Sequence, residues 1–422
     1  MSDSSKPAEY ILQLAKQAKK AARELAAVSG EARAAALAAM VDALQNSRSE
    51  LAKANTADLE DAWNAGLPQP MIARLEITDK VFDYMLKRLK EIAALPDPVG
   101  RTLEGFTRPN GFRASKVTVP IGVIGIIYES RPNVTTDAAS VCLKSGNAVI
   151  LRGGSESLRT NIVLTDAMKE AASKNGMPDN AIQIIRSADR ENVHHLLHMD
   201  RYVDVLIPRG GKSLIERVAS ESRIPVIKHY EGICHLYLAA DAPVERAVAV
   251  TVNSKCQRVE VCNALETLLI DVQTSERLLP ELKRAFDAEG VTLRGCARTR
   301  AILPDIEMAT EEDWSTEYLD RILSVRIVDG VTEAIGHINT YGSGHTDGII
   351  TDDIATARQF VASVDASSVL VNASTRLSGG GDYGMGAVVG ISTDKLHARG
   401  PVGPQELTSY KWVAYGDGHL RD

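Results

Sequence analysis

Residues 116–128 read KVTVPIGVIGIIY, and four more short apolar runs follow within about a hundred residues. They are NAVILRG (147–153), AIQIIR (181–186), VDVLIP (203–208) and RIPVIKHY (223–230). Helical segments separate these runs. Apolar runs of about four to eight residues between helices are typical of buried parallel strands. The pattern predicts an α/β domain built on one parallel sheet.

A second alternating series follows further along the chain and predicts a second α/β domain. Its expected strands are LETLLI (265–270), VRIVDG (325–330), GIIT (348–351) and SSVLVNA (367–373). Helices are expected between them, at 275–289, at 331–340 and up to about residue 364. The first hundred residues predict helices at 10–25, 31–64 and 78–95, because apolar residues recur there at helical spacing.

The composition excludes some classes of partner and indicates the compartment in which the protein works. The 422 residues are 44% apolar and 24% charged, with a net charge of −7, which are ordinary globular values. No run of like charge stands out, so neither nucleic acid nor an anionic membrane is an expected partner. The five cysteines form no CxxC pair and the N-terminus has no signal-peptide core. A protein of the cytoplasm is therefore expected.

Two further segments have strand character. Residues 99–112 alternate polar with apolar residues around the turn Pro109-Asn110-Gly111, which is typical of a hairpin. The terminal run LTSYKWVAY (407–415) reads as a lone strand. Because an isolated hairpin is marginal in water, these elements should pair with each other or with another subunit.

Cys262 is the first candidate for chemistry. It follows the polar, basic stretch 255–258 and precedes an expected buried strand. The cations Lys255 and Arg258 would favour its thiolate form. Cys256 competes with it on spacing, and a plain core cysteine is the alternative for either residue.

Two glycine-rich turns leave expected strands and enter expected helices. Gly210 and Gly211 would present backbone N–H groups to a phosphate, although a tight βα turn explains them as well. In the other turn, Arg152 and Ser155 suit an extra phosphate such as the 2′-phosphate of NADP, the alternative being an arginine on a surface loop. The two histidines of 337–348 are weak evidence for zinc, and no metal is expected.

Five motifs in order carry a family resemblance. They are PIGVIGIIYESRPNVT (120–135), CNALETLL (262–269), AIGHINTYGSGHTDGI (334–349), VNASTR (371–376) and KLHARGPVGPQELTSYKW (395–412). Through them the chain resembles the aldehyde dehydrogenase superfamily over nearly its whole length. Within the superfamily, the match is close to the branch that reduces an acyl phosphate in proline biosynthesis.

The resemblance implies three parts in each subunit. The first is a Rossmann-like NADP-binding domain formed by 1–98 and 115–233, to which 379–400 is added. The second is an α/β catalytic domain at 234–378. The third is an oligomerisation flap, which consists of 99–114 and 401–422.

The resemblance also assigns roles to residues. It implies that Cys262 is the nucleophile and that Arg152 replaces a lysine that contacts the adenosine ribose. Glu317 resembles the acid that binds the nicotinamide ribose. Gly210 and Gly211 fall where the family has the turn that contacts the pyrophosphate.

The chain departs from the wider superfamily at two places. The usual N-x-P reads Ser130-Arg131-Pro132 here and is followed by Asn133, so the Cys262 N–H would stabilise an oxyanion together with either Ser130 or Asn133. The general-base glutamate of hydrolytic members is replaced by His229. An enzyme that exchanges phosphate must not activate water on its thioester, so this loss is chemically sensible.

The implied reaction is the NADPH-dependent reduction of L-glutamyl 5-phosphate to L-glutamate 5-semialdehyde through a Cys262 thioester. The anionic substrate needs cations, and Lys255, Arg258, Arg131 and Arg376 are the candidates. The resemblance further implies a homo-oligomer, and a glutamate kinase is a potential partner that would supply the acyl phosphate. The alternatives are an NAD(P)-dependent aldehyde dehydrogenase of the same fold and an inactive relative with a structural or regulatory role.

Overall fold

The stretch 116–128 divides between two sheets in the computed structural model, which describes residues 5–421. β2 (Arg113–Pro120) belongs to a projecting sheet and β3 (Val123–Tyr128) lies in the body of the protein. Gly122 separates them at φ 135, in the region that favours glycine. The run 116–128 therefore contributes to two strands and not one, because Pro120 and Gly122 interrupt it.

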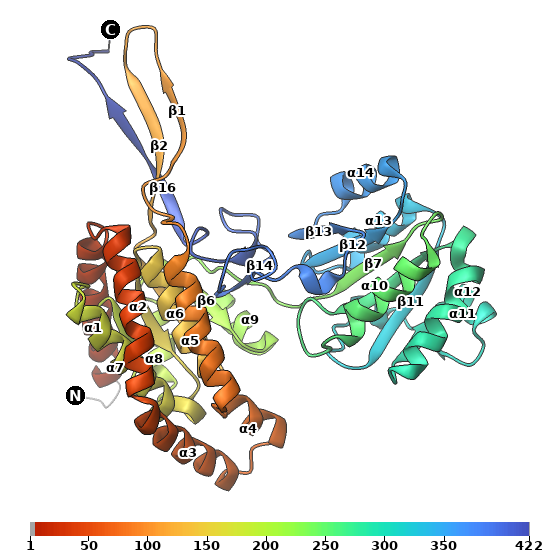
Figure 1. Ribbon diagram of the computed structural model, residues 1–422, viewed down its shortest axis with the longest axis horizontal. Helices are drawn as coiled ribbons and strands as arrows, with labels where there is room; N and C mark the ends of the chain where they lie inside the picture. The colour runs from red at the N-terminus through yellow and green to blue at the C-terminus, as the bar shows by residue number, and fades with distance from the viewer. Residues whose placement is uncertain (1–4, 422) are drawn as a thin grey trace.

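A four-stranded parallel sheet organises the first lobe (Figure 1). Its order is β5-β4-β3-β6, with β4 (Ala148–Arg152), β5 (Ile182–Ile184) and β6 (Val205–Arg209) beside β3. Each of these strands comes from one of the apolar runs.

The apolar run at 223–230 does not form the strand that its sequence predicts. It follows the edge of β6 but makes only one isolated bridge, between Leu206 and Val226. Pro225 accepts a bond from the Leu206 N–H through its carbonyl, yet has no N–H to donate in return. The segment therefore serves as the connection that leads to the second lobe.

Helices cover both faces of the first sheet. Strand residues such as Ile124 and Ile126 pack against α2, α5, α6 and α7, and Val123 and Ile127 pack against α1 and α8 on the other side. The helices of this lobe are α1 (Ser5–Leu25), α2 (Gly30–Asn46), α3 (Arg48–Asn64), α4 (Gln69–Leu75), α5 (Asp79–Ala94), α6 (Asn133–Lys144), α7 (Leu158–Lys174), α8 (Glu191–Leu197) and α9 (Lys212–Glu221). The helix expected over 31–64 is in fact two helices that meet at Ser47.

A seven-stranded parallel sheet organises the second lobe, in the order β10-β9-β11-β8-β7-β12-β13. Its strands are β7 (Cys234–Leu238), β8 (Leu265–Asp271), β9 (Thr292–Gly295), β10 (Glu307–Met308), β11 (Ile322–Val328), β12 (Thr346–Ile350) and β13 (Ser368–Val371). The sequence patterns predict four of these strands and miss β7, β9 and β10. Its helices are α10 (Val244–Cys256), α11 (Val272–Ala288), α12 (Ala297–Ile302), α13 (Val331–Tyr341) and α14 (Ile354–Ser363).

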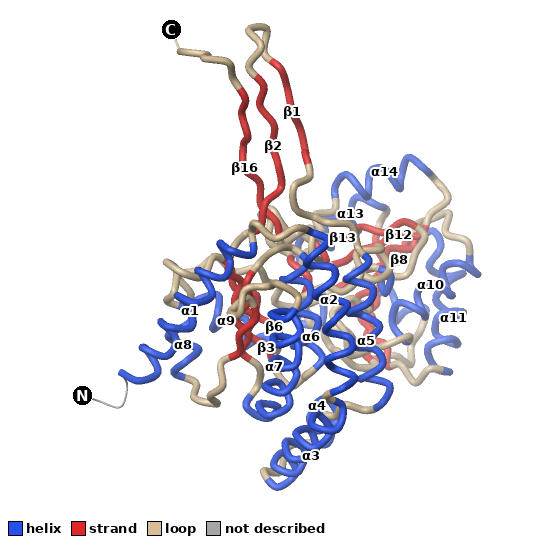
Figure 2. The backbone as a smooth tube through the Cα atoms, turned by 60° about the vertical axis from the view of Figure 1, so that its left-hand side comes forward, coloured by secondary structure: helices blue, strands red, loops and turns tan. Residues whose placement is uncertain are grey.

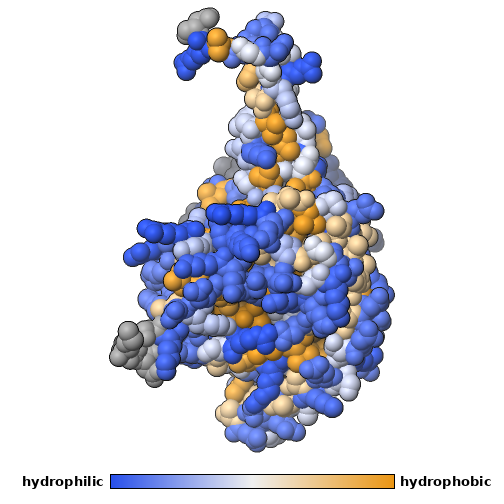
Figure 3. All heavy atoms as spheres, turned by 90° about the vertical axis from the view of Figure 1, so that its left-hand side faces the viewer, coloured by the Kyte–Doolittle hydropathy of each residue, from blue (hydrophilic) through white to orange (hydrophobic). Residues whose placement is uncertain are grey.

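A three-stranded antiparallel flap stands clear of both lobes (Figures 1 and 2). β2 is its central strand, between β1 (Thr102–Thr107) and β16 (Thr408–Tyr415). The hairpin and the terminal strand thus pair within one chain, and β2 extends the flap beyond residue 114. Its outer strands are largely exposed, and apolar residues are visible along the flap in Figure 3.

The segment that precedes β16 returns to the first lobe. It contains the short pair β14 (Gly390–Ser392) and β15 (Gly400–Val402). Val389, Ala398 and Leu407 belong to the same apolar core as α2 and α5. The C-terminal segment therefore completes the core of the first lobe. Among residues 5–421, no helix combines the length and the apolar character that crossing a membrane requires.

Candidate active site

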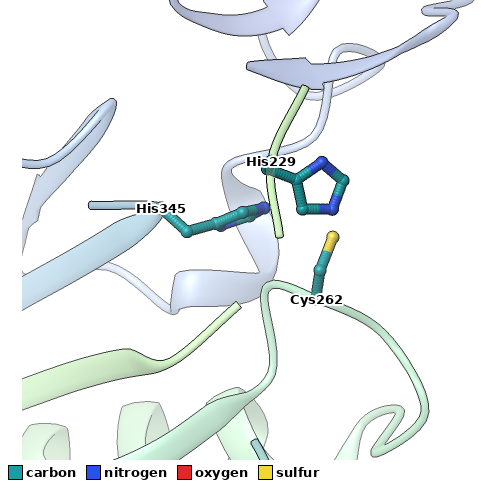
Figure 4. Close-up of side chains that lie close together, drawn as sticks. All are labelled: His229, Cys262 and His345. Atoms are coloured by element: carbon teal, nitrogen blue, oxygen red, sulfur yellow. The ribbon is translucent and has the colours of Figure 1, made fainter. Parts of the chain in front are cut away.

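Three side chains from distant parts of the chain meet where the two lobes join (Figure 4). Cys262 lies in the turn before β8, His229 in the connection between the lobes, and His345 directly before β12. One ring nitrogen of each histidine and the Cys262 Sγ all lie within 4.8 Å of one another. The structure thus surrounds this cysteine with imidazole groups.

Gly232 fixes the backbone that carries the thiol. A Cβ added to Gly232 would lie 1.8 Å from the Cys262 carbonyl oxygen, so only glycine fits at this crossing. The Gly232 N–H donates to Glu317 Oε1 at 2.8 Å. Burial raises the pKa of Glu317 above its ordinary value, although the Gly232 bond favours the carboxylate. Gly232 therefore contacts both Cys262 and Glu317, two of the residues that the sequence singled out.

Hydrogen bonds set the tautomer of both histidines. His229 Nδ1 lies 3.1 Å from the Ile391 carbonyl, which only accepts, so Nδ1 carries the hydrogen. His345 Nδ1 lies 2.8 Å from Thr346 Oγ1, whose own hydrogen goes to Ser378 Oγ. His345 Nδ1 is therefore also the protonated nitrogen. Burial lowers the pKa of His345 to about 4, so the ring is neutral.

Arginine side chains gather around Cys262. The pKa values of Arg131, Arg209 and Arg376 all lie below the ordinary value, because burial removes water from their guanidinium groups. A negative charge on the Cys262 sulfur would oppose this lowering in each case. Arg258 lies close enough to repel both Arg131 and Arg376. Arg209 ends β6 and was not among the residues singled out from the sequence.

Lys255 is not free to meet a substrate, contrary to the sequence prediction. Its side chain is 0% exposed and its Nζ donates to Glu266 Oε2 at 2.6 Å. Glu266 Oε1 accepts the Leu319 N–H. Burial raises the pKa of Glu266 to about 7, although the Lys255 ammonium favours the carboxylate. The pair is a structural ion pair inside the second lobe.

The Lys255 ion pair leads to a stability prediction. Lys255→Met should cost about 3–5 kcal/mol of unfolding free energy, because it leaves the Glu266 carboxylate buried without its partner. Urea unfolding measures this loss. The double variant Lys255→Met/Glu266→Leu should recover most of it. A raised Michaelis constant with unchanged stability would instead show that Lys255 reaches the substrate.

The two candidates for an oxyanion donor differ in their surroundings. The Ser130 N–H and hydroxyl both donate to Glu156 Oε1, at 3.1 Å and 2.6 Å. Ser130 also has φ 29, a backbone conformation that non-glycine residues rarely adopt. Asn133 begins α6, and its side chain hydrogen-bonds to Asp137. Ser130 is thus committed to Glu156, whereas an Asn133 amide has a second N–H to offer.

A second cluster of arginines lies at the carboxyl ends of the strands in the first lobe. Arg152 ends β4, Arg190 precedes α8, and Arg217 lies on α9. The pKa of Arg152 is lowered by burial and by repulsion from Arg190 and Arg217, against the attraction of Glu156. The Ser155 hydroxyl also points to Glu156, at 3.4 Å. Sequence reasoning missed Arg190 and Arg217, which no motif marks.

The glycine turn before α9 is occupied by a side chain of the protein itself. The Gly211 N–H donates to Glu129 Oε2 at 2.9 Å, and a Cβ on Gly210 would collide with the Glu129 side chain. The amide that was expected to meet a phosphate therefore meets a carboxylate here. This shows that the turn offers a donor to an anionic group.

Cys256, the competing nucleophile, points elsewhere. It ends α10 and packs against the apolar cluster that α10 and α11 share. Burial and the charge of Glu289 raise its pKa. A thiol in these surroundings is a poor nucleophile.

Comparison with known proteins places this arrangement in a family. The model of the aldehyde dehydrogenase family matches residues 4–292. The chain belongs to the aldehyde dehydrogenase family. The solved structure of gamma-glutamyl phosphate reductase from Thermotoga maritima is 40% identical, with a TM-score of 0.96, over 98% of this chain and 100% of that chain.

Two further solved structures are similar over nearly the same length. Gamma-glutamyl phosphate reductase from Saccharomyces cerevisiae is 31% identical, with a TM-score of 0.54, over 100% of this chain and 99% of that chain. An engineered glycolyl-CoA reductase with bound NADP+ is 16% identical, with a TM-score of 0.68 and 96% of each chain covered. The aldehyde dehydrogenase fold binds a nicotinamide cofactor, and the predicted fold class is confirmed.

Proposed function

We propose that this protein is a gamma-glutamyl phosphate reductase, which reduces L-glutamyl 5-phosphate to L-glutamate 5-semialdehyde and releases phosphate. The arrangement of Cys262 within a group of arginines is the observation that carries the proposal. A thiolate attacks an acyl carbon, and guanidinium groups bind phosphate and carboxylate oxygens. The 40% identity to the Thermotoga enzyme over 98% of the chain supports the same substrate.

The first step is the transfer of the acyl group to Cys262. His229 Nε2 has a free lone pair and, in Figure 4, faces Sγ, so it accepts the thiol proton. The thiolate then forms a bond to the acyl carbon, the bond from that carbon to the phosphate oxygen breaks, and phosphate leaves. Arg131, Arg258 and Arg376 stabilise the anionic substrate and the departing phosphate.

The second step is reduction of the resulting thioester. NADPH, when bound, supplies the hydride for this step. The Cys262 N–H and the Asn133 amide stabilise the negative charge on the former carbonyl oxygen. The carbon–sulfur bond then breaks, the aldehyde leaves and the Cys262 thiolate is restored.

The arginines of the first lobe suit the cofactor. Arg190 and Arg217 both repel Arg152, so a 2′-phosphate beside Arg152 would relieve an existing repulsion. Glu317, beside Gly232, would bind the nicotinamide ribose. Gly210 and Gly211 would accept the pyrophosphate in place of the Glu129 carboxylate.

The reverse reaction tests the proposed function. Glutamate 5-semialdehyde and NADP+ should yield NADPH only when inorganic phosphate is present, because phosphate must release the acyl group from Cys262. Absorbance of NADPH measures the rate. Equal rates without phosphate would identify an aldehyde dehydrogenase that forms a free acid, and no rate in either direction would identify an inactive relative.

Arg152→Ala should raise the Michaelis constant for NADPH by about 10- to 100-fold and leave that for NADH nearly unchanged. A charged hydrogen bond to the 2′-phosphate is worth roughly 1.5–3 kcal/mol, which corresponds to this factor. Steady-state kinetics with both cofactors measures it. Arg201→Ala, on the surface before β6, is the matched control. Equal increases for both cofactors would place Arg152 on the shared ribose instead.

We also propose that the protein is a homo-oligomer whose flap covers a partner. The flap has two unpaired edges, β1 and β16, and exposes Phe106, Tyr410 and Trp412. The Phe106 and Trp412 rings lie 6.1 Å apart and form one apolar area. A small sheet with open edges and exposed aromatic residues is typical of an interface.

A further inference from the structure

We propose that Cys262, His229 and His345 form a binding site for Zn²⁺, and that occupation of this site reversibly stops turnover. The binding itself follows from the three side chains alone. Only the loss of turnover rests on the function proposed above, because it requires Cys262 to be the nucleophile.

The three side chains present three free ligand atoms to one point. Because both Nδ1 atoms carry hydrogen, each histidine offers the lone pair of its Nε2. One ligand atom of each ring and the Cys262 Sγ lie within 4.8 Å of one another. A small movement of these side chains would bring all three to the distances of about 2.0–2.3 Å at which Zn²⁺ binds nitrogen and sulfur.

A buried nitrogen of His345 without a hydrogen-bond partner in the described part of the chain indicates that this site can accept a ligand. His345 is 0% exposed, and its Nε2 has no hydrogen-bond partner among the residues that the structure describes. Buried polar atoms are nearly always paired in folded proteins. In Figure 4 the ring extends toward the space between His229 and Cys262. A cation there would be bound by this lone pair, and so would explain why the atom is left free.

The outer contacts of the histidines are those of zinc ligands. Such a histidine usually donates its second N–H to a carbonyl, a carboxylate or another oxygen, which fixes its orientation. Here His229 donates to the Ile391 carbonyl, and His345 donates to the Thr346 hydroxyl. One thiolate and two imidazoles leave the fourth position of a tetrahedral ion open. Soft sulfur favours Zn²⁺ over Mg²⁺ or Ca²⁺.

The charged groups around the site weaken the binding of a divalent cation, so that it can be removed again. Arg131, Arg209 and Arg376 oppose a divalent cation, while Glu317, close to His345, favours it. Binding also releases the Cys262 thiol proton. We therefore expect an inhibitory site that binds Zn²⁺ more weakly than the closed sites that stabilise folds.

Co²⁺ titration without substrate or cofactor tests the binding. Co²⁺ replaces Zn²⁺ at such sites and shows a thiolate-to-metal charge-transfer band in the near ultraviolet. One Co²⁺ per chain should produce this band, and added Zn²⁺ should remove it. Neighbouring histidines such as His194 and His198 give no such band, because they offer no thiolate.

Variants assign the ligands. Cys262→Ala should abolish the band, and His345→Ala and His229→Ala should each weaken binding by about 100-fold or more, since even outer-sphere partners contribute 10- to 100-fold. His229 is only partly buried, so its variant remains informative if His345→Ala does not fold. Cys256→Ala and His397→Ala are matched controls that should bind normally. A band that persists in Cys262→Ala, or full affinity in both histidine variants, would overturn the site.

Turnover is measured separately. Zn²⁺ should inhibit the NADPH-dependent reaction at the concentrations that displace Co²⁺, and a chelator should restore the rate. Binding together with unchanged turnover would overturn the inhibitory role. A protein that binds Co²⁺ through Cys262 yet fails the phosphate test in the reverse assay would refute the proposed function while retaining the metal site.

Discussion

Cys262→Ser is expected to lower kcat by at least about 10³-fold, with folding and NADPH binding unchanged. The oxygen of serine is far less acidic than a thiol, and the neighbouring imidazole of His229 is a weak base for it. The side chains are nearly the same size, so the lobes should pack as before. Steady-state kinetics, a thermal melt and NADPH fluorescence measure the three properties.

Cys256→Ser is the matched control for this experiment. Its thiol packs between α10 and α11, away from the two histidines, so turnover should remain near that of the unchanged protein. Normal turnover in Cys262→Ser would refute the mechanism. An equal loss in Cys256→Ser would leave the identity of the nucleophile open.

Deleting residues 408–422 is expected to yield monomers or aggregates and to abolish activity. The deletion removes β16, which pairs with β2 along eight residues, from Thr408 to Tyr415. β2 would become an edge strand, and an edge of this kind either pairs elsewhere or aggregates. The deletion also removes Trp412, which is 53% exposed in a single chain and would cover the other subunit of the proposed oligomer. Sedimentation at micromolar concentration and turnover assays measure both effects.

A shorter deletion is the control for the flap. Removal of 416–422 leaves β16 intact and should preserve both mass and activity. The flap proposal is wrong if the intact protein sediments as a monomer. It is also wrong if the chain that lacks 408–422 keeps its mass and its activity.

Local patterns predicted most of the fold, and particular residues explain the failures. Buried parallel strands are short apolar runs, so β3, β4, β6 and β8 were recognisable. Ser47 interrupts two helices whose apolar spacing is otherwise continuous. Pro225 prevents a strand in the apolar run 223–230, because it has no N–H to donate to β6. The sequence alone does not show that β6 is its neighbour.

The site was less predictable because its parts are distant in sequence. Cys262 stood out by its polar surroundings, and the position of His229 came from a family comparison. No local signal shows that His345 meets them, since its role depends on the crossing of β12 beside β7. The prediction that Lys255 binds the substrate is wrong for a related reason. A lysine next to a reactive motif suggests a ligand contact, but its true partner, Glu266, lies on β8.

The return of the C-terminal segment to the first lobe has a consequence for biosynthesis. The second lobe comes from one continuous stretch, β7 to β13, whereas the first-lobe core includes Val389, Ala398 and Leu407. On the ribosome, the N-terminal half therefore emerges first but lacks part of its interior until translation is nearly finished. The second lobe can fold as soon as residue 371 leaves the exit tunnel. The usual N-to-C order of co-translational folding should thus be reversed in this chain.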